Sequence, residues 1–345
     1  SAASDVYKRQ LVKEQGYHVI GATMRLWTYS DSCNMKHEGC CAESAVEDAR
    51  RVCDKLGIDF YVMNFKDMFK DKVVDYFVDE YIHGRTPNPC IACNKYLKFD
   101  ALLKKALAMG IDYVATGHYA KIEKGEDGKY ILRASEAVKK DQSYVLYNFT
   151  QEQLAHTLMP LGGYNKDWVR QKAEELGLGV AHKPDSQEIC FVEDDDYAKF
   201  ITDYSGYKPK EGDILDVNGN VIGKHRGLIY YTIGQRKGIG AYGRPMFVMK
   251  IDAENNTITL GEKGMEFSNE LTAYDVNFVS GEFPKENMLI TAKVRYQAPP
   301  AAAMLCPQKD GTVKLMFPEP QRAVTPGQAV VFYDGDIVLG GGTVL

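Results

Sequence analysis

In the first 195 residues, apolar positions recur in a unit made of a helical stripe, a glycine and a short apolar run. In the second copy the apolar positions are three and four residues apart up to Leu56, and Gly57 follows where a helix ends through a left-handed residue. A helix followed by a buried strand, repeated four times, predicts a doubly wound parallel sheet with helices on both faces. The four copies are "LVKEQGYHVIGATM" (11–24), "ARRVCDKLGIDFYVMNF" (49–65), "LLKKALAMGIDYVATGH" (102–118) and "RQKAEELGLGVAHKP" (170–184).

After about residue 205 the pattern changes to short alternating runs separated by Gly, Asn and Pro. Asn218–Gly219 and Asn255–Asn256 lie between apolar runs and predict hairpin turns. A break within 261–276 divides this all-β part into two modules. The domains predicted from these changes are 1–195, 196–265 and 266–345.

Composition limits the class of protein. The 345 residues are 45% hydrophobic and 26% charged, which is enough for two or three globular domains. Eight cysteines are too few for a secreted disulfide scaffold, and no signal-peptide pattern opens the chain, so a reducing cytoplasm is expected. No apolar run approaches the roughly 20 residues of a membrane helix, so no membrane partner is expected. A net charge of −5 argues against bulk attraction to nucleic acid but leaves room for local basic patches.

The cysteines differ in their sequence context. Cys53 lies on a helical stripe and Cys306 in a β segment, so both are expected to be small core residues. A polar loop carries a further group that could bind zinc, although its spacing fits no standard zinc pattern. This group is Cys33, His37, Cys40 and Cys41.

The stretch "TPNPCIACNKYLKF" (86–99) places a Cys-x-x-Cys pair in a proline-rich loop that leads into a helix. Such a loop is expected to be exposed, and a helix N-terminus stabilises a thiolate, so Cys90 and Cys93 are candidate reactive thiols. Cys190 follows the fourth unit and is expected at the same carboxyl edge of the sheet. Taken alone, the pair is as consistent with a structural role, as half of a metal site or as two packed thiols, as it is with reactive thiols. The third cysteine, Cys190, favours reactive thiols.

Six motifs together resemble the tRNA-specific 2-thiouridylase family, the MnmA/TrmU type, in order from about residue 11 to the C-terminus. The resemblance implies an ATP-pyrophosphatase-like domain, a central β domain and a C-terminal β-barrel that together hold a tRNA. It also implies that ATP, with Mg²⁺, adenylates the wobble uridine at its C2 oxygen, and that sulfur from a donor protein then replaces this oxygen. The donor would be a cysteine desulfurase or a relay protein. The motifs are "GRTPNPCIACNKYLKFD", "ATGHYAKI", "KKDQSYVLY", "KPDSQEICFV", "YTIGQRKGIG" and "VRYQAPP".

The resemblance also implies roles for single residues. Cys93 matches the nucleophile and Cys190 the persulfide carrier, and a transient disulfide would join them after turnover. Met24 and Gly117 match positions that contact ATP; without the resemblance they would be read as a core methionine and a turn glycine. Asn88, Pro89 and Cys90 match positions that line the target base. The positions that match tRNA contacts, each of which alone would be read as solvated surface, are His118, Lys140, Asp141, Gln142, Arg295, Tyr296 and Gln328.

Two features depart from the family pattern. The first is the opening "SAASDVYKRQ", which stands in place of the phosphate loop Ser-Gly-Gly-x-Asp-Ser. Ser4 could cap a helix that runs through Val6 and Leu11. Without the loop, this chain is expected to bind ATP weakly and not to thiolate tRNA, whereas its full-length parent would.

The second departure is Cys90, where many family members carry aspartate. Together with Cys93 and Cys190 it supplies three thiols, one fewer than usually hold a [4Fe–4S] cluster, so a cluster with one open iron is an alternative to the persulfide relay. Two further alternatives remain. One is a tRNA-binding or sulfur-carrying protein that has lost adenylation. The other is a Cys-x-x-Cys redox protein, which would leave the basic Arg236–Lys237 turn unexplained.

Overall fold

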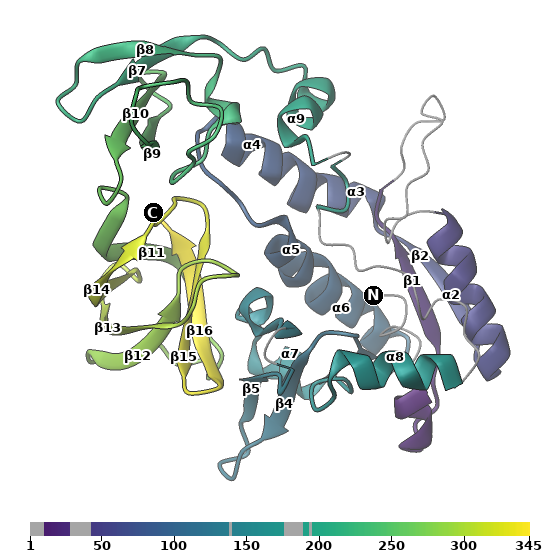
Figure 1. Ribbon diagram of the computed structural model, residues 1–345. Helices are drawn as coiled ribbons and strands as arrows, with labels where there is room; N and C mark the ends of the chain where they lie inside the picture. Colours follow the sequence, from purple (N-terminus) through teal and green to yellow (C-terminus); the bar gives the residue numbers. More distant parts are fainter. Residues whose placement is uncertain (1–9, 28–42, 138–139, 176–188, 193–194) are drawn as a thin grey trace. The chain divides into compact units, whose positions relative to one another are not determined.

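A computed structural model describes residues 10–27, 43–137, 140–175, 189–192 and 195–345 of the chain (Figure 1). The chain divides into two compact units. The first consists of Ser1–Val74, Cys90–Asp195 and Asp336–Val338; the second consists of Asp75–Pro89, Asp196–Gly335 and Leu339–Leu345. The division into three domains at 195/196 and 265/266 remains a prediction.

Parallel strand pairs form the sheets of the first unit, as the repeated helix–strand pattern predicts. Strand β1 (Gly21–Arg25) pairs with β2 (Phe60–Asn64), and β3 (Val114–Ala115) pairs with β6 (Thr157–Leu158). Gly57 follows α2 with a φ of +64°, so the predicted left-handed helix exit is confirmed. The strand predicted within 176–184 lies outside the described residues. The helices and helical turns are α2 (Glu43–Leu56), α3 (Lys66–Phe69), a π-helical turn (Lys70–Asp75), α6 (Leu102–Ala108), a 3₁₀ turn (Ser143–Leu146), α7 (Gln151–Ala155) and α8 (Lys166–Glu175).

An antiparallel hairpin, β4 (Ala120–Lys124) and β5 (Tyr130–Ala134), also belongs to the first unit and was not predicted. Arg133 on β5 pairs in register with Ile337 and forms an ion pair with Asp336 at 2.8 Å. These contacts explain why 336–338 group with the first unit, although they lie near the end of the chain.

A four-stranded sheet occupies the central part of the second unit, in the order β8-β7-β10-β9. Both predicted hairpins are confirmed, because Gly219 lies between β7 and β8 with a φ of +86° and Asn256 lies between β9 and β10 with a φ of +50°. The elements are α4 (Tyr76–Ile82), α9 (Tyr197–Ser205), β7 (Gly212–Leu215), β8 (Val221–His225), a 3₁₀ turn (Leu228–Tyr230), β9 (Met246–Asp252) and β10 (Thr257–Glu262).

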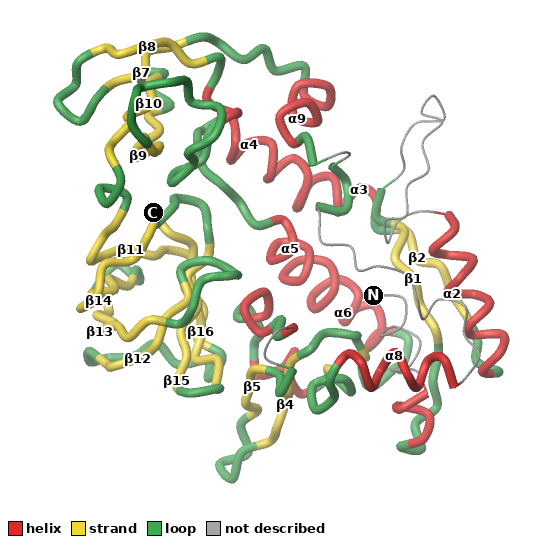
Figure 2. Tube along the Cα trace, in the orientation of Figure 1, coloured by secondary structure: helices red, strands yellow, loops and turns green. Residues whose placement is uncertain are grey.

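The remaining strands close a six-stranded barrel. Their order is β11-β14-β13-β12-β15-β16, and β16 pairs back onto β11 (Figures 1 and 2). Inward residues such as Leu305 and Leu315, which face each other on β13 and β14, form its core. Cys306 is the next residue after Leu305 and is therefore only half-buried, so the prediction that it is a core residue is wrong. The strands are β11 (Phe267–Phe278), β12 (Met288–Lys293), β13 (Ala301–Pro307), β14 (Val313–Arg322), β15 (Ala329–Asp334) and β16 (Ile337–Val344).

Asp252, in the hairpin between β9 and β10, should make the free energy of unfolding depend on pH in the acid range. Hydrogen bonds from the Asn255 backbone N–H, from Lys250 and from the Asn255 side chain lower the pKa of Asp252 to about 2. A carboxyl whose pKa is lowered by folding stabilises the folded state at pH values above its unfolded pKa, which is 3.8 for Asp252. This stabilisation is lost as the pH falls through about 2. We expect Asp252→Asn to lower the urea midpoint more at pH 5 than at pH 2. An equal loss at both pH values would contradict this assignment.

Among the described helices, none combines the length and apolar character that a membrane crossing requires.

Candidate active site and RNA-binding residues

The Cys-x-x-Cys pair lies at the beginning of a helical stretch, as predicted. Helix α5 (Pro89–Ala92) carries Cys90, and Cys93 begins a π-helical segment, Cys93–Ala101. Cys90 is exposed, whereas Cys93 is only 8% exposed, so the expectation that the loop exposes both thiols is wrong for Cys93. The cause is the helical spacing, which places Cys93 on the same side as Leu97, a fully buried residue four positions later.

The next residue, Asn94, shows that this helix start is firmly packed. Its side chain is buried and donates a hydrogen bond to the Val145 carbonyl at 2.9 Å. A buried amide that reaches a backbone carbonyl fixes the rotation of the helix. Because the helix cannot rotate freely, this hydrogen bond also fixes the position of the adjacent Cys93 thiol.

Cys190 lies in a tight turn of the first unit. The Val192 backbone N–H donates to the Ile189 carbonyl at 3.0 Å, so Cys190 and Phe191 are the two central residues of the turn. Cys190 is half-buried, while Phe191 is 1% exposed. The turn thus presents the thiol and buries the ring beside it.

Phe191 packs into an aromatic cluster. Its ring centroid is 5.7 Å from that of Phe69 on α3 and 6.5 Å from that of Trp27, which follows β1 by two residues. The Phe69 pair is edge-on and the Trp27 pair is tilted. Aromatic pairs of this kind are worth ~1 kcal/mol each beyond the apolar area they bury. The cluster therefore fixes the Cys190 turn to the carboxyl end of β1.

Replacing the ring should release the turn. We expect Phe191→Ala to raise the rate at which Cys190 reacts with iodoacetamide by several-fold, because the turn opens more often. The rate at Cys90, which is already exposed, serves as the internal control. Mass spectrometry of the alkylated peptides measures both rates, and an unchanged Cys190 rate would show that the ring does not restrain the turn.

No group of three or more His, Cys, Asp or Glu side chains that could hold a metal ion occurs in the described residues. Cys90, Cys93 and Cys190 are all described, so this arrangement does not fit a cluster on the three thiols. The candidate zinc residues Cys33, His37, Cys40 and Cys41 lie outside the described residues.

The candidate nucleotide contacts lie at the carboxyl ends of parallel strands, where such sheets bind ligands. Met24 is half-buried near the end of β1, and Gly117 is half-buried in the loop after β3. In the same loop the Thr116 hydroxyl and His118 Nδ1 are 2.9 Å apart, and the His118 ring packs against Phe99 with centroids 5.7 Å apart. Gly117 therefore lies in a braced loop.

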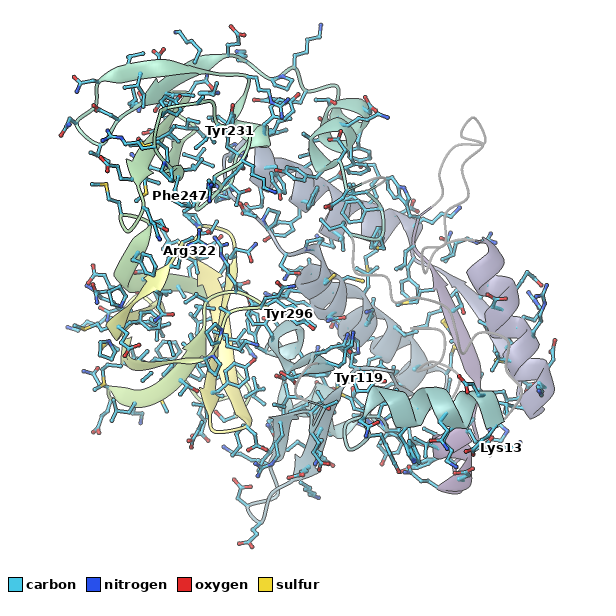
Figure 3. All side chains as sticks on the ribbon, viewed as in Figure 1. Lys13, Tyr119, Tyr231, Phe247, Tyr296 and Arg322 are labelled. Carbon is cyan, nitrogen blue, oxygen red and sulfur yellow. The ribbon has the colours of Figure 1, made fainter. Side chains whose placement is uncertain are left out.

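Two of the candidate tRNA contacts hold the structure of the first unit. The Gln142 side-chain oxygen accepts from the Tyr119 N–H at 3.0 Å, and the Gln142 backbone N–H donates to the Tyr119 carbonyl at 2.9 Å. Asp141 accepts from the N–H groups of Ser135 and Ser143. Figure 3 marks Tyr119. Lys140, the third residue of this motif, is half-buried.

In the second unit, the segment that leads to the cysteine pair is attached to a barrel loop. The Thr86 N–H donates to the Pro326 carbonyl at 2.9 Å, and Gln328 Nε2 donates to the Thr86 carbonyl at 2.8 Å. Gln328 thus binds protein in this structure. The target-base candidates Asn88 and Pro89 follow directly, with Asn88 half-buried and Pro89 buried.

An ion pair that no sequence pattern predicted braces the same segment. Arg85 binds the Glu80 carboxylate through Nε, at 2.9 Å, and through Nη2. Glu80 is 5% exposed, and its hydrogen bond raises the pKa of Arg85. Five residues separate the two along the chain, so no helical spacing signalled the pair.

Arg295 also binds protein. Its Nη2 donates to the Ala323 carbonyl at 2.7 Å, to the Thr325 hydroxyl at 2.6 Å and to the Ile233 carbonyl at 3.1 Å. Tyr296 is 40% exposed and presents a ring that can stack on a base (Figure 3). Of the two residues expected to contact RNA, Arg295 therefore forms hydrogen bonds within the protein, whereas Tyr296 is accessible.

Known proteins match this chain along nearly its whole length. Three family models match: the tRNA methyl transferase HUP domain at residues 4–194, the tRNA methyl transferase PRC-barrel domain at 198–262, and the aminomethyltransferase beta-barrel domain at 268–344. The tRNA-specific 2-thiouridylase MnmA of Acetivibrio thermocellus is 58% identical over 97% of this chain and 94% of its own length. The MnmA of Clostridioides difficile is 56% identical over 97% of this chain and 93% of its own length. The chain belongs to the MnmA family of tRNA-specific 2-thiouridylases.

Proposed function

We propose that this protein is a tRNA 2-thiouridylase, which replaces the C2 oxygen of the wobble uridine with sulfur. The observation that carries the proposal is the match to MnmA proteins over 97% of the chain, with the cysteine motifs of both thiols present. The resemblance assigns ATP to the first unit, where Met24 and Gly117 would contact it. ATP, with Mg²⁺, would convert the C2 oxygen into a leaving group.

The two thiols would then divide the sulfur chemistry. Cys190 would receive a sulfur atom from a donor protein as a persulfide, and the terminal sulfur would attack C2 of the uridine and displace AMP. The Cys93 thiolate would attack the Cys190 sulfur, which breaks the S–S bond, releases 2-thiouridine and leaves a Cys93–Cys190 disulfide. An external thiol would supply two electrons to reduce it, in keeping with a reducing cytoplasm.

The packing of the two thiols supports these roles. The half-buried Cys190 in its turn can meet a donor protein, whereas the buried Cys93 is shielded from outside reagents. The cluster alternative has less support, because the described residues form no metal-binding group. Anaerobic reconstitution with iron and sulfide tests it, and stable iron in the wild type but not in Cys90→Asp would favour the cluster.

Expression in a host that lacks its own 2-thiouridylase tests the function. Mass spectrometry of tRNA nucleosides distinguishes 2-thiouridine from the methylated nucleosides that the family-model descriptions would suggest. A second version, in which a Ser-Gly-Gly-x-Asp-Ser loop replaces 1–10, tests the prediction made from those residues. If the second version forms 2-thiouridine, the result supports the proposed function. If neither version forms 2-thiouridine, the result overturns the proposed function.

A further inference from the structure

The segment between Asp216 and Asp252 is basic, although the whole chain is acidic. Residues 217–251 contain six Lys or Arg residues and no Asp or Glu, against a net charge of −5 for the chain. Such a segment can attract a polyanion locally. The six cations are Lys224, Arg226, Arg236, Lys237, Arg244 and Lys250.

Three of these cations are already paired with carboxylates. Arg244 lies 2.7 Å from Glu262, and Lys250 lies 3.1 Å from Asp252. Lys224 pairs with Asp213 in the same way. Arg236 and Lys237 differ, because both side chains are exposed and neither has an ion-pair or hydrogen-bond partner within the described residues.

The turn that carries Arg236 and Lys237 is held by the side chain before them. Gln235 Oε1 accepts from the Thr232 N–H at 2.9 Å, while Nε2 donates to the carbonyls of Tyr230 at 3.2 Å and Lys237 at 2.9 Å. The Gln235 side-chain amide thus binds backbone groups on both sides of Gln235, at Tyr230 and Thr232 before it and at Lys237 after it. The two cations are presented on a formed backbone and lose less entropy on binding.

The base of the turn is anchored as well. The Gly234 N–H donates to the Val248 carbonyl of β9 at 2.8 Å, and the Val248 N–H donates to the Gln235 carbonyl at 3.0 Å. Ile239, which follows the turn, is 4% exposed in the core of the four-stranded sheet. Arg295 holds the Ile233 carbonyl from the barrel. Together these contacts fix the position of the backbone that carries Arg236 and Lys237.

From this arrangement we infer that the 232–238 turn is an RNA-backbone contact, with Arg236 and Lys237 binding tRNA phosphates. A guanidinium binds phosphate in a fork and an ammonium binds it as a point charge. The inference rests on the proposed function, since tRNA is the polyanion concerned. It also gives Arg295 a different role: this residue supports the turn that contacts RNA instead of contacting phosphate through Nη2.

Filter binding of a tRNA transcript at several salt concentrations tests the inference. Arg236→Gln/Lys237→Gln should weaken binding about 10- to 50-fold near 0.1 M salt and reduce the salt slope by about 1.5 to 2. The matched control is Arg244→Gln/Lys250→Gln, which removes one Arg and one Lys from existing ion pairs and should change affinity less than about 3-fold. Gln235→Ala, which keeps both charges, should also weaken binding because the turn loses its brace.

The outcomes separate this inference from the proposed function. If the unaltered protein does not bind tRNA, the function fails. If it binds tRNA and the Arg236/Lys237 variant binds equally well with the same salt slope, the turn is not an RNA contact and the function stands. If that variant keeps tRNA affinity but loses sulfur transfer from a donor protein, the inference is also overturned and the turn contacts protein instead.

Discussion

In the version of the protein that carries the Ser-Gly-Gly-x-Asp-Ser loop, Cys190→Ser is expected to abolish 2-thiouridine formation, by on the order of 10³-fold or more, while tRNA binding stays unchanged. Serine is close in size to cysteine but cannot carry a persulfide, so the sulfur has no acceptor. Because Cys190 is half-buried, the substitution leaves no cavity. The measurement is nucleoside mass spectrometry, combined with filter binding of tRNA.

Two further variants separate the roles of the thiols. Cys93→Ser should still accept a persulfide at Cys190 and pass its outer sulfur to C2 of the uridine, but no second thiol then breaks the bond between the two sulfurs. A disulfide between Cys190 and the tRNA should therefore accumulate, and gel electrophoresis without reductant detects it. Cys306→Ser is the matched control, since it removes another half-buried thiol, on β13 of the barrel. Full thiouridine formation by Cys190→Ser would end the persulfide assignment, and so would loss of activity in the Cys306 control.

The sequence predicted the elements that local patterns encode. The parallel pairing of β1 with β2, the helix exit at Gly57 and the two β modules are confirmed, because apolar spacing and turn residues specify them within a few residues. Barrel closure depends on the pairing of β16 with β11, from Phe278 with Gly340 to Ala273 with Val344, which are 62 and 71 positions apart along the chain. Only the family resemblance implied this long-range pairing.

The burial of single side chains was harder to predict. Cys93 and Cys306 were each placed in the wrong environment, because burial depends on helix rotation and strand alternation against partners that lie far away in sequence. The Glu80–Arg85 pair has a five-residue spacing that matches no helical repeat. The attachment of Thr86 to Gln328 joins residues 242 positions apart, so it has no local signal either. Phe191 could have been found, since an aromatic residue directly after a candidate thiol suggests an anchor.

Gly327→Ala is expected to destabilise the second unit by about 2–4 kcal/mol. Gly327 has a φ of +87°, and a Cβ there would lie 2.9 Å from the Thr86 nitrogen, 3.1 Å from the Arg85 Cβ and 3.2 Å from Glu80 Oε2. Two of these atoms belong to backbone or to a buried carboxylate, so they cannot move aside cheaply. The added methyl group should therefore separate the barrel loop from the segment that precedes Cys90.

Hydrogen exchange and denaturant unfolding measure this effect. The amides of Thr86 and Gly327, which donate to Pro326 and Val344, should exchange faster in the variant. Gly311→Ala is the matched control, because Gly311 has a similar φ of +83° but nothing within 4 Å of the added Cβ, so it should cost only ~1 kcal/mol. Both tryptophans, Trp27 and Trp168, lie in the first unit, so their emission reports that unit separately while circular dichroism follows the whole chain. Equal losses in the two variants would mean that the backbone conformation alone requires glycine at 327, and that contact with Thr86, Arg85 and Glu80 adds nothing to stability.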